Sequence, residues 1–373
     1  MNNDLSSYFE DPEFKEALEK YEGMVKNHTP AYFDADELTD IAEYYASKGR
    51  QIEAEAAIDF ALQLHPNDTD ALIFRARSLA MKGRLDEAYM VMDLIEDRSD
   101  REVRFLKADL LMEEKRMEEA DHVFEELAAY EEGKLETLID IILAYIDANQ
   151  EALAKKWIKH VGETYDLASL SQKNQKFRDL LCDFYITFNN PEAAIPLLQA
   201  TLDCYPYSIN HWNSLGKCYL STNDYEEAHE AIDFALAIDD SNAEALTLKA
   251  FCYQQSGELQ KSCDYYLRLA EQQENKTRAY LALAKTYFEM QDYTSSIYYI
   301  EALLDNKDAL SKYELSELYG DIALCHAALK HIGVGQASIR RSLELNENDP
   351  DTLIVAGRFF LMEAKACNDE TAK

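Results

Sequence analysis

The sequence predicts an all-α fold, an α-solenoid in which short helix hairpins stack in series. The stretch 209–242 contains two amphipathic segments, and the first brings Trp212 and Gly216 onto one helical face. The second segment repeats this spacing with Ala228 and Ile232. Similar pairs of segments recur about every 34 residues, and only 7 Pro and 11 Gly interrupt the chain. Because neither helix of a pair can bury its apolar face alone, the pairs must pack on one another.

The expected units follow one another from residue 35. The first four span about 35–68, 69–100, 101–133 and 135–165, the fifth runs from 175 to 206, and the sixth is 209–242. Three further units bring the number to about nine. The third unit is about two residues short, and extra residues, about six at 165–173 and about five at 305–314, interrupt the spacing. We expect each insertion to lengthen a helix or a loop and to change the path of the stack.

A single helix is expected at each end of the stack. The first begins at Asp11-Pro12, and its apolar face carries Phe14, Ala17, Leu18, Tyr21 and Val25. The last begins at Asp349-Pro350. Terminal helices of this kind cover the open ends of a repeat array.

Within the fourth unit, the same helical spacing assigns the packing positions of the second helix to Ala154, Ile158 and Val161.

The pattern in 209–242 resembles the tetratricopeptide repeat, in which W-x2-L-G-x2-Y is followed by A-x3-F and then by P over 34 residues. The sequence departs from it at Ile232, where the family prefers Phe, and at Asp240, where it prefers Pro. The resemblance covers nearly the whole chain and is most specific from the fifth to the eighth unit. It implies a right-handed superhelix with a concave groove lined by the first helix of each unit.

This organisation divides the chain into four segments. They are a capping helix in 1–34, units one to four in 35–173, units five to eight in 174–310, and unit nine with a second capping helix and a polar tail in 311–373.

The charge balance argues against polyanionic partners. The chain has 37 basic and 71 acidic residues, a formal net charge of -34. Nucleic acid and anionic membranes would be repelled, whereas a basic protein would be attracted. The first residues lack the charged and apolar regions of a secretory signal, and no apolar run is long enough to span a membrane. The seven cysteines include no C-x-x-C pair, so we expect reduced, packed thiols in a cytoplasmic protein.

Signatures of catalysis and of cofactor binding are not found. The sequence contains no phosphate-binding glycine loop, no H-E-x-x-H and no G-x-S-x-G. His326 and His331 are five residues apart, which does not place them on one helical face for zinc. We therefore expect no enzyme, no metal and no cofactor. The alternative is a hydrolase or transferase whose catalytic carboxylates lie on the inner face and have raised pKa values.

The resemblance places the partner-binding residues on the concave face of the first helices. In the middle of the chain these are Asn210, Asn213, Lys217, Thr247, Phe251, Gln254, Arg278, Leu281, Lys285 and Phe288. Amides can bond a peptide backbone, cations can meet a carboxylate, and rings can hold an apolar anchor. Ordinary solvated positions would have the same composition. The N-terminal groove would contain Asp36, Asp40, Glu43, Phe74, Arg77, Phe105, Asp109, Asp140 and Asp147, which suits a basic or amphipathic partner.

The sequence therefore predicts a non-catalytic scaffold that binds a protein or peptide in its concave groove. The family's two-Lys, two-Asn, one-Arg clamp for acidic chaperone C-termini is not expected, because Leu248 stands where that clamp needs a polar group. Self-association through an edge helix is a further possibility.

Overall fold

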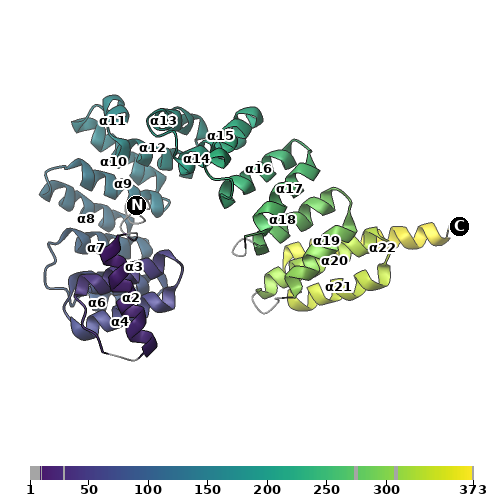
Figure 1. Ribbon diagram of the computed structural model, residues 1–373, viewed down its shortest axis with the longest axis horizontal. Helices are drawn as coiled ribbons and strands as arrows, with labels where there is room; N and C mark the ends of the chain where they lie inside the picture. Colours follow the sequence, from purple (N-terminus) through teal and green to yellow (C-terminus); the bar gives the residue numbers. More distant parts are fainter. Residues whose placement is uncertain (1–8, 10, 28–29, 273–275, 306–309, 372–373) are drawn as a thin grey trace. The chain divides into compact units, whose positions relative to one another are not determined.

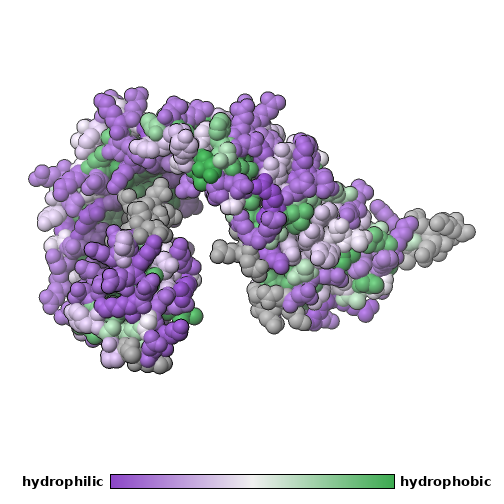
Figure 2. All heavy atoms as spheres, in the orientation of Figure 1, coloured by the Kyte–Doolittle hydropathy of each residue, from purple (hydrophilic) through white to green (hydrophobic). Residues whose placement is uncertain are grey.

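The computed structural model describes residue 9 and residues 11–27, 30–272, 276–305 and 310–371. The described chain contains 21 α-helices and no strand, so the all-α prediction is confirmed (Figure 1). The helices form two compact parts, Met1–Asp166 and Leu167–Lys373, called here the N-terminal part and the C-terminal part. Hydrophilic side chains cover most of the face of each part that is in view in Figure 2.

The N-terminal part consists of one lone helix and four antiparallel hairpins. The lone helix is α2 (Pro12–Asn27). The hairpins are α3 (Ala35–Ser47) with α4 (Gln51–Leu64), α5 (Thr69–Met81) with α6 (Leu85–Met92), α7 (Arg101–Glu113) with α8 (Met117–Tyr130), and α9 (Leu135–Asp147) with α10 (Glu151–Thr164). Each second helix also contacts the first helix of the next hairpin, so the hairpins stack in series.

The C-terminal part repeats this plan between one short and one long helix. The short helix is α11 (Leu167–Lys173), and the long one is α22 (Pro350–Thr371). The hairpins are α12 (Gln175–Thr187) with α13 (Pro191–Cys204), α14 (Ile209–Thr222) with α15 (Tyr225–Ile238), α16 (Ala243–Gln255) with α17 (Leu259–Ala270), α18 (Lys276–Glu289) with α19 (Tyr293–Leu304), and α20 (Lys312–Ala328) with α21 (Ile332–Leu345). How many hairpins qualify as repeats stays a prediction.

A residue with positive φ marks the turn inside every hairpin. These residues are Gly49, Gly83, Lys115, Asn149, Asn189, Asn223, Gly257, Gln291 and Lys330. The left-handed residue ends the first helix, because it lets the next backbone N–H turn back to a carbonyl five residues earlier. In the hairpin of α14 and α15, for example, Asp224 N donates to Tyr219 O over 2.9 Å.

The positions of these turns confirm the irregular spacing read from the sequence. Gly83 and Lys115 are 32 residues apart, while Asn189, Asn223 and Gly257 follow at steps of 34. The first insertion forms the additional helix α11. The second precedes α20, which has 17 residues where the other first helices have 13 or 14, and residues 306–309 of this insertion lie outside the described residues.

Packing follows the predicted faces, with three exceptions. A Cβ added to Gly216 would lie 2.8 Å from Ile232 Cγ1, so the two helices approach closely where the family has its small residue. However, Trp157 rather than Ile158 is buried in α10, because its indole N–H finds the Asp121 carboxylate on α8. The Trp212 ring is only half-buried. Val25 of α2 is also exposed.

Candidate partner-binding site

The ten predicted binding residues lie on three successive first helices, α14, α16 and α18. Asn213 on α14 is buried, and its amide group donates to Asn242 Oδ1 over 3.1 Å and to Glu244 Oε2 over 3.0 Å. Lys217, one turn further along α14, forms an ion pair with the same Glu244. Asn213 and Lys217, which we expected to bind a ligand, are therefore bonded to residues of, or next to, the neighbouring first helix α16.

A second bridge joins α16 to α18. Gln254 Nε2 lies 2.8 Å and 2.9 Å from the two carboxylate oxygens of Glu289. These bridges bring neighbouring first helices together side by side. They leave Phe251 and Phe288 as the exposed large apolar side chains of the predicted set.

Two phenylalanines flank the bridge between α16 and α18. Phe251 lies one turn before Gln254 and is 42% exposed, and Phe288 lies next to Glu289 and is 37% exposed. Phe288 also packs edge-on against Tyr293, with ring centroids 5.4 Å apart. Large apolar rings that remain half in water on two adjacent helices form an anchor point for an incoming apolar side chain.

The other predicted residues differ in how far they are available. Asn210, Arg278 and Lys285 are exposed, and Leu281 is half-buried. Thr247 is half-buried, and its hydroxyl donates to Ala243 O in its own helix over 2.7 Å.

Three acidic residues on this face were not among the predicted residues. Glu244 and Glu289 supply the two bridges, and Asp321 on α20 faces Lys285. Burial raises the pKa of Asp321 to about 6, although Lys285 partly opposes the rise. The 34-residue period could have found Glu244, because it stands midway between Asn210 and Arg278 at the equivalent position.

The first helices of the N-terminal part carry a row of acids. Burial raises the pKa of one carboxyl group on each of α3, α5, α7 and α9, and these are Glu43, Asp70, Asp109 and Asp147. The Asp109 pKa rises to about 6 although Arg77 Nε lies 3.4 Å from its Oδ2. Arg101 pairs with Asp140 between α7 and α9.

The aromatic members of this N-terminal set are less available than expected. Phe105 is buried, and Phe74 is half-buried against the core of the first hairpin. The exposed character of this face therefore comes mainly from carboxylates. These carboxylates attract cations, because Arg77 and Arg101 balance only part of their negative charge.

Other chemistry-bearing groups do not gather into a site in the described ranges. No group of three or more His, Cys, Asp and Glu side chains could hold a metal ion among these residues. The six described cysteines are free, and five of them are buried. Burial raises the pKa of Cys182 to about 12, which keeps that thiol protonated and unreactive. None of the described helices is both long and apolar enough to cross a membrane.

Comparison with protein families finds one matching family model, described as tetratricopeptide repeat, over residues 39–89 and 213–277. A curated protein, the formate-dependent nitrite reductase complex subunit NrfG of Escherichia coli O157:H7, is 26% identical over 191 residues. The aligned region covers 49% of this chain and 89% of that protein.

The chain is also similar in fold to several solved structures. The type IV pilus biogenesis factor PilW aligns at 15% identity and a TM-score of 0.48, over 59% of this chain and 97% of that one. A tetratricopeptide repeat protein from Parabacteroides merdae ATCC 43184 aligns at 16% and 0.43, over 68% and 98%. MamA aligns at 19% and 0.42, over 48% and 93%.

Proposed function

We propose that this chain, which is a tetratricopeptide-repeat protein, is a non-catalytic scaffold that binds a protein or peptide along the first helices of its C-terminal part. Tetratricopeptide-repeat proteins generally mediate protein–protein interactions. The observation that supports binding along these first helices is the pair of half-exposed rings, Phe251 and Phe288, beside the bridge between α16 and α18. A partner's apolar side chain would pack there, while Arg278 and Lys285 meet its carboxylates.

The acid row of the N-terminal part supports a partner that is basic in another segment. Four first helices each present a carboxyl group there, and the net charge of -34 strengthens the attraction. The same proposal puts the protein in the cytoplasm, where free thiols such as the six described here persist.

The catalytic alternative has one observation in its favour. Two carboxyls on first helices, Asp109 and Asp321, have a pKa raised to about 6, as a general acid would require. Each faces a cation, Arg77 beside Asp109 and Lys285 beside Asp321, which suits a charged binding residue. The other raised carboxyls are distributed one per helix. This spread favours binding over catalysis.

The proposal is tested by quantitative capture from a lysate of the native cell. Wild-type protein and the Phe251→Ser/Phe288→Ser double variant are immobilised side by side, and the bound proteins are measured by mass spectrometry. We expect the double variant to capture at least tenfold less of one specific partner than the wild type does. Affinity for that partner is then measured with both purified proteins, so that an indirect contact is recognised.

Tyr298→Ser is the matched control. Tyr298 is 63% exposed, but it lies on the second helix α19 rather than on a first helix. Its loss should leave the partner bound. Equal capture by the wild type and the double variant would contradict the proposal, as would turnover of a substrate that is lost on replacing Asp109 or Asp321.

A second role, self-association, is favoured by the last helix. Four apolar side chains on α22 are about half or more exposed, namely Leu353, Ile354, Phe360 and Leu361. They lie three and four residues to either side of Gly357, around which a Cβ would meet no atom within 4 Å. Two copies of α22 packed antiparallel about this glycine would therefore bring apolar side chains to the same levels.

Light scattering over a concentration series tests this second role. We expect dimers that strengthen with salt, because salt screens repulsion between two chains of charge -34. Leu361→Glu should return the protein to monomer, and Val25→Glu at the exposed apolar position on α2 should not. A monomer at every concentration and salt level would refute the dimer.

A further inference from the structure

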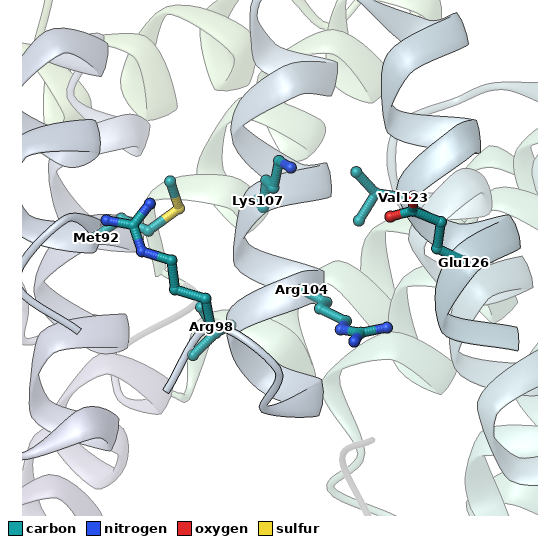
Figure 3. A pocket seen from close by; sticks show the side chains of 7 residues that line it. Met92, Arg98, Arg104, Lys107, Val123 and Glu126 are labelled. Carbon is teal, nitrogen blue, oxygen red and sulfur yellow. The ribbon is translucent and has the colours of Figure 1, made fainter. Parts of the chain in front are cut away.

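A hollow of about 210 Å³ opens in the N-terminal part between α6, α7 and α8. Its apolar lining comes from Met92, Val103 and Val123. Its charged lining consists of Arg98, Arg104, Lys107 and Glu126. Figure 3 shows Met92 and Arg98 on one side, Val123 and Glu126 on the other, and Lys107 and Arg104 on α7 between them. Its lining includes no member of the acid row and neither Phe251 nor Phe288.

The hollow occupies a place that another repeat fills with its own aromatic rings. Aligning Ala108 on α7 with Gly216 on α14 matches Arg104 to Trp212 and Glu126 to Phe234. Those two rings stack with centroids 4.5 Å apart and planes 18° from parallel. The third repeat therefore has an Arg and a Glu where the sixth has a packed Trp and Phe.

Two further changes enlarge this space. Leu215, which is buried, corresponds to Lys107. The preceding helix α6 has 8 residues, whereas its counterpart α13 has 14, so more than a turn of helix is missing beside the hollow. Both changes replace apolar packing by a cavity with a basic edge.

The cations are only partly neutralised. Arg98 donates to Asp93 Oδ1 over 2.8 Å, and Arg104 lies 4.8 Å above the ring of Tyr130. Within the described residues, neither Arg104 nor Lys107 has an ion pair. In a chain of net charge -34, three basic side chains around an apolar hollow form a local exception that an anionic ligand can use.

We propose that this hollow binds an acidic peptide segment of a partner by taking in one large apolar side chain. Pockets for drug-sized ligands usually measure about 300–1,000 Å³, so this one suits a single side chain. An aromatic ring would take the place of the absent Trp, with Arg104 against its face. Carboxylates on either side of that ring would pair with Arg98 and Lys107.

Fluorescence anisotropy with the full-length protein tests the proposal. The probe is a labelled Glu-Glu-Phe-Glu-Glu peptide, and the competitors are Gln-Gln-Phe-Gln-Gln, Glu-Glu-Ser-Glu-Glu and free phenylacetate. We expect each altered peptide to bind at least tenfold more weakly than the probe, and the probe's affinity to fall as salt is added. Equal binding of the Ser peptide would reduce the effect to general charge attraction and overturn the proposal, and phenylacetate binding as tightly as the probe would overturn the peptide as occupant.

The decisive variant restores the repeat's own packing. Arg104→Trp/Lys107→Leu fills the hollow and removes two cations, so probe binding should fall at least tenfold while the helix content stays that of the wild type. Arg104→Gln/Lys107→Gln removes the charges without filling the space, and it should also weaken binding. Lys159→Gln, on the exposed side of α10, is the control and should bind normally. Unchanged probe binding in both double variants would refute the site.

Discussion

Replacing Asp121 tests how strongly one half-buried carboxylate connects three helices. Asp121 on α8 accepts hydrogen bonds at one oxygen from Trp157 Nε1 over 2.8 Å and from the Tyr145 hydroxyl over 3.0 Å. Lys156 Nζ lies 2.5 Å from its other oxygen. Trp157 and Tyr145 are buried and belong to α10 and α9. The carboxylate therefore satisfies two donors in the next hairpin that have no access to water.

The contacts set the size of the effect. Asp121→Ala leaves both buried donors without an acceptor, at about 1–3 kcal/mol each, so we expect a loss of about 3–5 kcal/mol. Asp121→Asn keeps an amide oxygen for Trp157 and Tyr145 and loses mainly the attraction to Lys156. Because Lys156 is nearly half exposed, that loss should be about 1 kcal/mol or less.

The assay uses the tryptophans as local probes. The chain has 2 Trp, so Trp212→Phe leaves Trp157 as the single reporter of the N-terminal part. Urea denaturation followed by its fluorescence then gives the stability around Asp121 in each variant. Glu151→Ala is the control, because it removes an exposed ion pair with Lys155 that should contribute less than about 0.5 kcal/mol.

The pH dependence of the same measurement follows from the pKa of Asp121. Burial tends to raise this pKa, but the hydrogen bonds from Lys156, Trp157 and Tyr145 outweigh burial and lower it. A lowered pKa means that the carboxylate stabilises the fold above the unfolded value near about 4 and that this stabilisation is lost as pH falls below it. The gap between wild type and Asp121→Asn should therefore shrink below about pH 4. Equal stability of all three proteins at pH 7 would refute the reasoning.

Three other predictions concern packing and turns. Trp157→Ala should cost about 3–5 kcal/mol, and more than Trp212→Ala, because only the first ring is fully buried; circular dichroism in urea measures both. Lys115→Gly should stabilise the protein by about 0.5–1 kcal/mol, because its φ of 63° suits glycine, and an unchanged or lower melting temperature would contradict this. Gly335→Ala should destabilise by about 1–3 kcal/mol, since its Cβ would lie 2.5 Å from a buried ring, whereas Gly357→Ala should be neutral or slightly stabilising for the monomer; calorimetry at low protein concentration separates the two.

Sequence periodicity predicted the hairpins because it depends on short-range geometry. Residues four and seven apart share one face of a helix, so Ala228 and Ile232 had to face the same neighbour. The family resemblance then located the first-helix face, including Phe251 and Phe288. Helical spacing predicted Ile158 rather than Trp157 as the buried residue. It contains no information about Asp121, the hydrogen-bond acceptor of Trp157, which is 36 residues away in the sequence.

The amino-acid sequence by itself determined the order and spacing of the elements: helix, turn and helix at steps of about 34 residues. It also determined where the insertions lie that form α11 and precede the long α20. Tertiary structure alone decided which polar groups are available. Lys217 is joined to Glu244, while Arg104 and Lys107 border an unfilled hollow. The physical reason is that helical faces follow from neighbours along the chain, whereas pairing and cavities depend on side chains that only folding brings together.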